Sequence, residues 1–182
     1  FFSAEEIIYV LFGPQWGNSV PVFKILSLSI GIQMVSSSTG SIYQSINRTD
    51  LMFYSGLMSA VFMIGGILSG IFIGKSLEAV GLGLLISFLL SFIQGFYILI
   101  HIAIKKSFFK FLKTFIFPIL ISLCIGAVLF LFQPIFPKQQ ILSLLFKIII
   151  TLISFIIFVS INEENRMIIK NYYTKLKSKI HS

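Results

Sequence analysis

A run of polar side chains crosses one apolar segment of this 182-residue sequence and could contact a polar ligand. At about 100° per residue, its positions fall within an arc of roughly 100° on one side of a helix. They are Gln33, Ser37, Gly40, Ser41, Gln44 and Arg48. Because polar groups that face lipid are costly, we expect this stripe to face protein or a water-filled cavity. The stripe predicts either the wall of a cavity for a polar cargo or a surface of interhelical hydrogen bonds and close packing.

Two cations add to these candidates. Arg48 lies with Asp50 in a predicted tight turn between two apolar segments, where a guanidinium can meet a phosphate or act as a positive anchor at the membrane surface. Lys147 lies within the last apolar segment. It is either a functional residue or a lysine whose side chain extends to the membrane surface. The candidate substrate-cavity residues are Gln33, Ser37, Ser41, Gln44, Arg48 and Lys147.

Other chemistry has no support in the sequence. The two histidines, His101 and His181, have no Cys or carboxylate nearby, and Cys124 is the single cysteine, so we predict no metal site and no disulfide. There is no Ser/His/Asp set, no pair of carboxylates within an apolar run and no Gly-rich phosphate loop. We expect a protein that is not an enzyme and that has no cofactor.

The composition predicts an all-α membrane protein. Hydrophobic residues make up 57% of the chain and charged residues 11%, against about 25% in a soluble domain. Five apolar runs are long enough to cross a bilayer as helices, at about 21–47, 51–74, 79–104, 112–132 and 141–161. We therefore expect a bundle of about five transmembrane helices at 21–161. Residues 1–20 would form a helix capped by Ser3 and Glu6, followed by an external loop.

The cations predict the orientation of this bundle. Ten of the 14 Lys and Arg residues fall in the turn at Arg48, in the connection at 105–113 and in the tail at 162–182. Five helices place these three regions on one side, which the positive-inside rule makes cytoplasmic. The net charge of +8 is then explained by membrane lipids as partners, with no need for nucleic acid.

Small residues indicate where helices approach closely. They recur at every fourth position in the second and third runs, as Gly66, Gly70 and Gly74 and as Gly83, Ser87, Ser91 and Gly95. Rows of this kind let two helix backbones pack tightly in a membrane.

The segment from about residue 3 to residue 95 resembles a known family. It reads Leu11-Phe12-Gly13, then Trp16, then Ile25-Leu26-Ser27, and its first span ends in Gln44, Arg48 and Asp50. This pattern is similar to bacterial polysaccharide flippases of the multidrug/oligosaccharidyl-lipid/polysaccharide exporter superfamily. The resemblance implies 12 to 14 helices in two lobes, of which this chain would be the C-terminal lobe, with an N-terminal lobe of the same protein as its partner.

The resemblance also implies a function. The chain would help to flip a polyprenyl-diphosphate-linked oligosaccharide across the bacterial cytoplasmic membrane for cell-surface polysaccharide biosynthesis, with Gln33, Gln44 and Arg48 in the cavity wall and Lys147 behind them. Two alternatives stay open. An ion-coupled small-molecule exporter should carry carboxylates within its spans, and these spans have none. A membrane scaffold of a glycan-assembly complex would not need a hydrated stripe.

Overall fold

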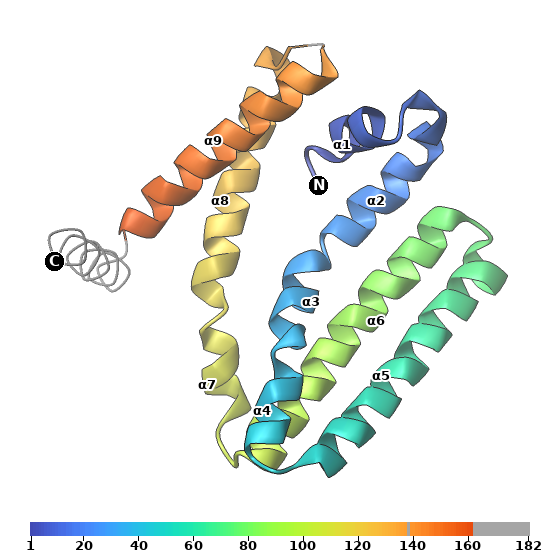
Figure 1. Ribbon diagram of the computed structural model, residues 1–182, viewed down its shortest axis with the longest axis vertical. Coiled ribbons are helices and arrows are strands. Elements are labelled where there is room, and N and C mark those ends of the chain that lie inside the picture. Colours follow the sequence, from blue (N-terminus) through green and yellow to red (C-terminus); the bar gives the residue numbers. More distant parts are fainter. Residues whose placement is uncertain (138, 162–182) are drawn as a thin grey trace, which may run out of the picture. The chain divides into compact units, whose positions relative to one another are not determined.

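The computed structural model describes residues 1–137 and 139–161, and the predicted basic tail at 162–182 lies outside the described residues. The chain divides into two compact units, residues 1–116 and the residues from 117 onward, and each is described by itself. All regular elements of the described residues are helices (Figure 1). The predicted all-α class is therefore confirmed.

The described helices include four that are long and apolar enough to cross a membrane. They are Thr49–Gly74, Leu77–Ala103, Phe108–Ile135 and Gln140–Ile157, and a bent pair, Pro14–Ser27 with Ile30–Ser45, provides a fifth if it counts as one span. The four helices lie at the second to fifth predicted runs, and the bent pair at 14–45 lies where one span at 21–47 was expected. The chain is a multi-pass membrane protein.

The first unit begins with α1 (Ala4–Leu11), a 3₁₀ turn η1 (Pro14–Ser19) and α2 (Val20–Ser27). Helix α1 starts at the predicted residue, but the Ser3 side chain makes no capping hydrogen bond, so the predicted capping box is wrong. The chain continues through α3 (Ile30–Ser37), α4 (Thr39–Ser45), α5 (Thr49–Ser69) with the π-helical η2 (Gly70–Gly74), α6 (Leu77–Tyr97) with the π-helical η3 (Ile98–Ala103), and α7 (Phe108–Lys113).

The predicted first span is bent by 50° between α2 and α3. Ser27 and Ser29 each donate a side-chain hydrogen bond of 2.7 Å to a backbone carbonyl three residues earlier. The backbone N–H groups of Leu28 and Ser29 also bond to carbonyls three residues earlier, which tightens the turn. Hydroxyl groups that bond back to the helix in this way bend it. With a further break between α3 and α4, three consecutive helices replace the single helix expected here.

Helices α5 and α6 pack face to face through the predicted small residues. A Cβ atom on Gly66 would collide with the backbone carbonyl of Gly83 and with the Ser87 hydroxyl, and one on Gly70 would collide with the backbone of Val80. The close approach lets Ser87 Oγ lie 2.7 Å from the carbonyl oxygen of Phe62 on α5. The two glycine rows therefore hold the spacing between these helices, as small residues do in membranes.

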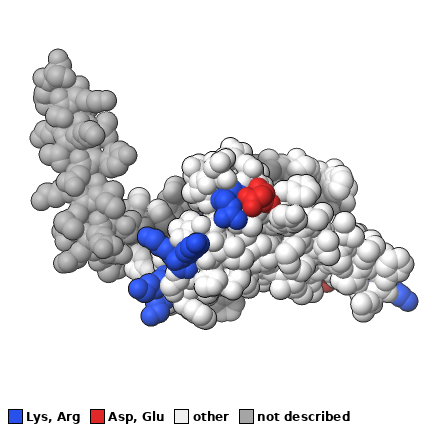
Figure 2. Space-filling model, turned by 90° about the horizontal axis from the view of Figure 1, so that it is seen from below, with Lys and Arg blue, Asp and Glu red and all other residues white. Residues whose placement is uncertain are grey.

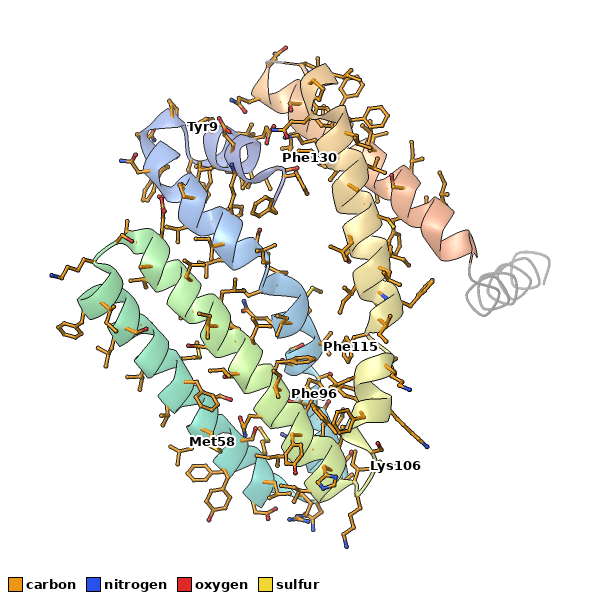
Figure 3. The ribbon with its side chains drawn as sticks, turned by 180° about the vertical axis from the view of Figure 1, so that it is seen from behind. Tyr9, Met58, Phe96, Lys106, Phe115 and Phe130 are labelled. Carbon is orange, nitrogen blue, oxygen red and sulfur yellow. The ribbon has the colours of Figure 1, made fainter. Side chains whose placement is uncertain are left out.

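An aromatic cluster closes one end of this unit. Tyr43 of α4, Phe96 of α6 and Leu99 of η3 are buried together. Phe96 stacks on Phe111 of α7 with ring centroids 4.8 Å apart, and Figure 3 labels Phe96 where α6 nears this end. The Tyr43 hydroxyl donates to the Gly95 carbonyl at 3.1 Å. The packing of these rings and the Tyr43 hydrogen bond fix how α4 is rotated against α6.

The second unit contains α8 (Ile116–Phe132, whose first residue falls in the first unit), η4 (Gln133–Ile135) and α9 (Gln140–Ile161). Its helices are almost wholly apolar, as expected for the fourth and fifth spans.

Candidate functional site

A groove of about 440 Å³ lies among α3, α4, α5 and α6 of the first unit. Seven of its lining residues have hydroxyl or amide side chains, in addition to Tyr43: Gln33, Ser36, Ser37, Thr39, Ser55, Ser59 and Ser91. No charged residue is among the described residues that line it. The groove is thus a neutral, hydrogen-bonding surface inside a set of membrane-spanning helices.

The groove includes part of the predicted stripe. Gln33, Ser37 and Gly40 line it, whereas Ser41, Gln44 and Arg48 do not. On an ideal helix, the lining face is rotated by roughly 80° from the centre of the stripe. Tyr43 explains the rotation, because its burial turns its own side of α4 inward and leaves Ser41 and Gln44 exposed. A cargo-contacting role for these outer residues stays a prediction.

The wall on α3 and α4 is built to accept hydrogen bonds. Ser36, Ser37 and Thr39 donate their hydroxyl hydrogens to carbonyl oxygens of their own helical turns at 2.7 to 2.8 Å. Each hydroxyl therefore keeps acceptor lone pairs for another molecule. Gln33 is held in place, since its Nε2 donates at 2.7 Å to the hydroxyl of Ser29, a fully buried residue at the bend.

Polar atoms without hydrogen bonds lie on and next to the wall formed by α5 and α6. Gln94 Nε2 donates to Ser55 Oγ at 3.3 Å. The hydroxyl of Ser91 and the amide oxygen of Gln94 are buried and make no hydrogen bond within the described residues. A buried polar atom without a partner costs about 1–3 kcal/mol. Ser91 lines the groove, so its hydroxyl stands to gain from a hydroxyl-bearing ligand or water there, whereas Gln94 is not among the lining residues.

Several groove residues were not predicted from the sequence. Ser36 and Thr39 belong to an unbroken run of four hydroxyl residues at 36–39, which is unusual inside a span and could have drawn attention to this turn. Ser55 and Ser59 are one helical turn apart on α5, a spacing that resembles the packing rows of small residues. Nothing in the sequence separates a hydroxyl that lines a groove from one that packs.

Arg48 lies at the turn between α4 and α5, outside the groove lining. Its Nε lies 3.1 Å from Asp50 Oδ1 and its second guanidinium nitrogen 3.3 Å from Oδ2, a bidentate ion pair. Asn47 has a left-handed backbone (φ 54°), and the N–H groups of Asn47 and Arg48 bond to carbonyls of the last turn of α4. This is a Schellman ending. Arg48 therefore has a structural role in the turn, and its predicted role with a phosphate stays a prediction.

Lys147 belongs to the second unit. Its side chain is 8% exposed, and its Nζ lies 5.3 Å from the centroid of the Phe136 ring, within range of a cation–π contact. Phe136 lies in the connection between η4 and α9, so the ammonium group extends toward that end of the span, and a functional role for Lys147 stays a prediction. Among the described residues there is no group of three or more His, Cys, Asp or Glu side chains that could hold a metal ion.

Comparison with known proteins gives one relationship. A stretch of 76 residues, 42% of the chain, is 33% identical to the succinoglycan biosynthesis transport protein ExoT of Rhizobium meliloti (strain 1021). The chain covers 15% of the length of that protein. No protein-family model matches the chain, and no solved structure matches it. Part of the chain is therefore similar to a bacterial protein of polysaccharide biosynthesis and transport.

Proposed function

We propose that this chain is part of a membrane transporter that flips a polyprenyl-diphosphate-linked oligosaccharide across the bacterial cytoplasmic membrane. It would supply one lobe of a two-lobed transporter of 12 to 14 helices, and an N-terminal lobe of the same protein would supply the other. The similarity to a succinoglycan transport protein supports the class of cargo. The chain spans only a small part of that relative, so the transport activity of the whole protein is part of this proposal.

The observation that carries the proposal is the neutral groove in the first unit. Sugars are uncharged and rich in hydroxyl groups, and the Ser36, Ser37 and Thr39 hydroxyls offer lone pairs to such donors. A groove of about 440 Å³ falls in the range of small-ligand pockets, about 300–1,000 Å³. The groove would therefore hold a sugar unit of the cargo, while cations elsewhere in the protein would meet its diphosphate.

The exposed part of the stripe supports a second lobe. Ser41 and Gln44 are not covered by the chain described here. Since amides and hydroxyls are costly against lipid, we expect further protein or a water-filled cavity on this side. In a two-lobed transporter the face between the lobes meets that need.

The orientation follows from the cations. With the turn at Arg48, the connection at 105–113 and the tail on one side, the positive-inside rule gives a cytoplasmic C-terminus. The predicted external loop at 12–18 would then lie on the opposite side.

The test is a substitution in the groove of the full-length protein. Gln33→Leu removes an amide from the groove wall at nearly constant volume, and Gln133→Leu makes the same change at an exposed position in η4. We expect Gln33→Leu to reduce glycan export by about tenfold, equivalent to about 1.4 kcal/mol, while Gln133→Leu leaves it unchanged. Normal export by Gln33→Leu at normal protein abundance would contradict the proposal.

A further inference from the structure

A second pocket lies at the corner where η3 turns into α7, also within the first unit. It has a volume of about 550 Å³ and is lined by Ile100, Ile104, Lys106, Ser107, Lys110 and Phe111. Figure 3 labels Lys106 at this connection. The pocket thus combines an apolar wall with two ammonium groups and a hydroxyl.

The backbone fixes the position of the corner. Lys105 has a left-handed conformation (φ 58°), which reverses the chain after η3. The N–H of Ile104 donates to the Leu99 carbonyl at 3.0 Å, and that of Lys106 donates to the Ile100 carbonyl at 2.8 Å. Lys106 therefore emerges from a hydrogen-bonded turn at the end of a membrane-spanning helix, the depth at which lipid headgroups lie.

Among the described residues, no carboxylate pairs with the lysines of this corner. Residues 104–116 contain four lysines and no acidic residue. Neither Lys106 nor Lys110 forms an ion pair within the part of the chain that the structure describes. Figure 2 shows this end of the first unit, where blue side chains gather. The corner therefore suits an anion, and its apolar wall suits one that carries hydrocarbon.

We infer that this pocket binds an anionic phospholipid, with the phosphate between Lys106 and Lys110 and the upper part of an acyl chain against Ile104 and Phe111. Basic pockets next to transmembrane helices bind such headgroups, and each lysine near the surface contributes about 1 kcal/mol to the attraction. Phe109, which is 78% exposed, lies on the same short helix and would enter the surrounding lipid. The site is separate from the groove, and the inference does not rest on the proposed transport.

Binding of phosphatidylglycerol to the purified full-length protein tests the site. The variant Lys106→Gln/Lys110→Gln removes the two pocket lysines, and the matched control Lys105→Gln/Lys113→Gln removes two lysines of the same connection that do not line the pocket. We expect the pocket pair to weaken binding at least about tenfold more than the control pair, because both pairs lose the same general attraction to an anionic surface and only the pocket pair loses direct contact with the phosphate. Lys106→Arg/Lys110→Arg should retain binding, and phosphatidylcholine should bind each form equally weakly.

Three results would overturn the inference. Equal losses in the pocket and control pairs would mean general attraction to a basic surface. Equal binding of phosphatidylglycerol and phosphatidylcholine would mean that no anion is recognised. Displacement of phosphatidylglycerol by polyprenyl diphosphate at a concentration well below that of the phospholipid would mean that the pocket belongs to the cargo. Loss of lipid binding with normal glycan export would leave the proposed transport intact.

Discussion

Replacing Gly66 by Ala should separate α5 from α6, and the neighbouring Gly65 provides the matched control. An added Cβ on Gly66 would lie 2.9 Å from the carbonyl carbon of Gly83 and closer still to its oxygen and to the Ser87 hydroxyl. Backbone atoms of a packed helix cannot rotate away as a side chain can. An added Cβ on Gly65 meets nothing within 4 Å.

The expected difference follows from two losses. Overpacking of this kind costs about 1–3 kcal/mol. Displacement of Ser87 also weakens its 2.7 Å hydrogen bond to the Phe62 carbonyl, worth about 0.5–1.5 kcal/mol. Both variants gain the same helix propensity of Ala over Gly, about 0.5–1 kcal/mol, so this gain cancels between them. The free energy of unfolding of Gly66→Ala should therefore be lower than that of Gly65→Ala by about 1.5–4.5 kcal/mol.

Reversible unfolding of the full-length protein in mixed detergent micelles measures this difference. Because Met63 and Ser91 line the groove from α5 and α6, we also expect Gly66→Ala to reduce glycan export. Equal unfolding free energies for the two alanine variants would refute the reasoning, since they would mean that the close approach at Gly66 and Gly83 does not exist in the folded protein.

Three further predictions concern the first span and its groove. Thr39→Val removes a groove hydroxyl and should lower export severalfold, whereas Thr114→Val, at an exposed position outside the groove, should not; an export assay with both variants decides. Ser29→Ala removes the acceptor of the Gln33 amide, so its loss of export should be largely non-additive with that of Gln33→Leu in a double-mutant cycle, and full additivity would contradict the positioning role. Asn47→Ala should lower the free energy of unfolding by about 1 kcal/mol and Asn47→Gly should not, because the left-handed backbone there favours glycine; equal stabilities would contradict this account.

Much of the fold could be predicted from the sequence because membrane helices obey a strong length rule. Each apolar run had to satisfy its own backbone hydrogen bonds, so helices at 51–74, 79–104, 112–132 and 141–161 followed directly. The packing of Gly66 and Gly70 against α6 followed from their spacing. These features depend on local sequence and on the solvent, and they need no knowledge of distant contacts.

The bend of the first span was harder to predict. Ser27 and Ser29 read as two polar residues in an apolar run, and only the structure shows both hydroxyls bonding to carbonyls three residues earlier. The same residues in a straight helix would have an identical sequence pattern. Whether the helix bends depends on its local hydrogen bonds and on its packing against other helices. Ser29 contributes to both, because it is fully buried at the bend.

The rotation of α4 explains why the candidate site was only partly found. A stripe of polar residues suggests which side of a helix avoids lipid, but the packing of an aromatic ring and its interhelical hydrogen bond can turn another side of the helix inward. Tyr43, 2% exposed and bonded to Gly95, turns Ser36 and Thr39 into the groove and leaves Gln44 outside it. The run at 36–39 then has two effects, because its hydroxyls bond back to their own helix at the junction of α3 and α4 and also supply the acceptors of the groove wall. Irregular helices within the membrane are tolerated where they line a cavity. The hydroxyl residues at 36–39 therefore account both for the break between α3 and α4 and for the polar wall of the groove.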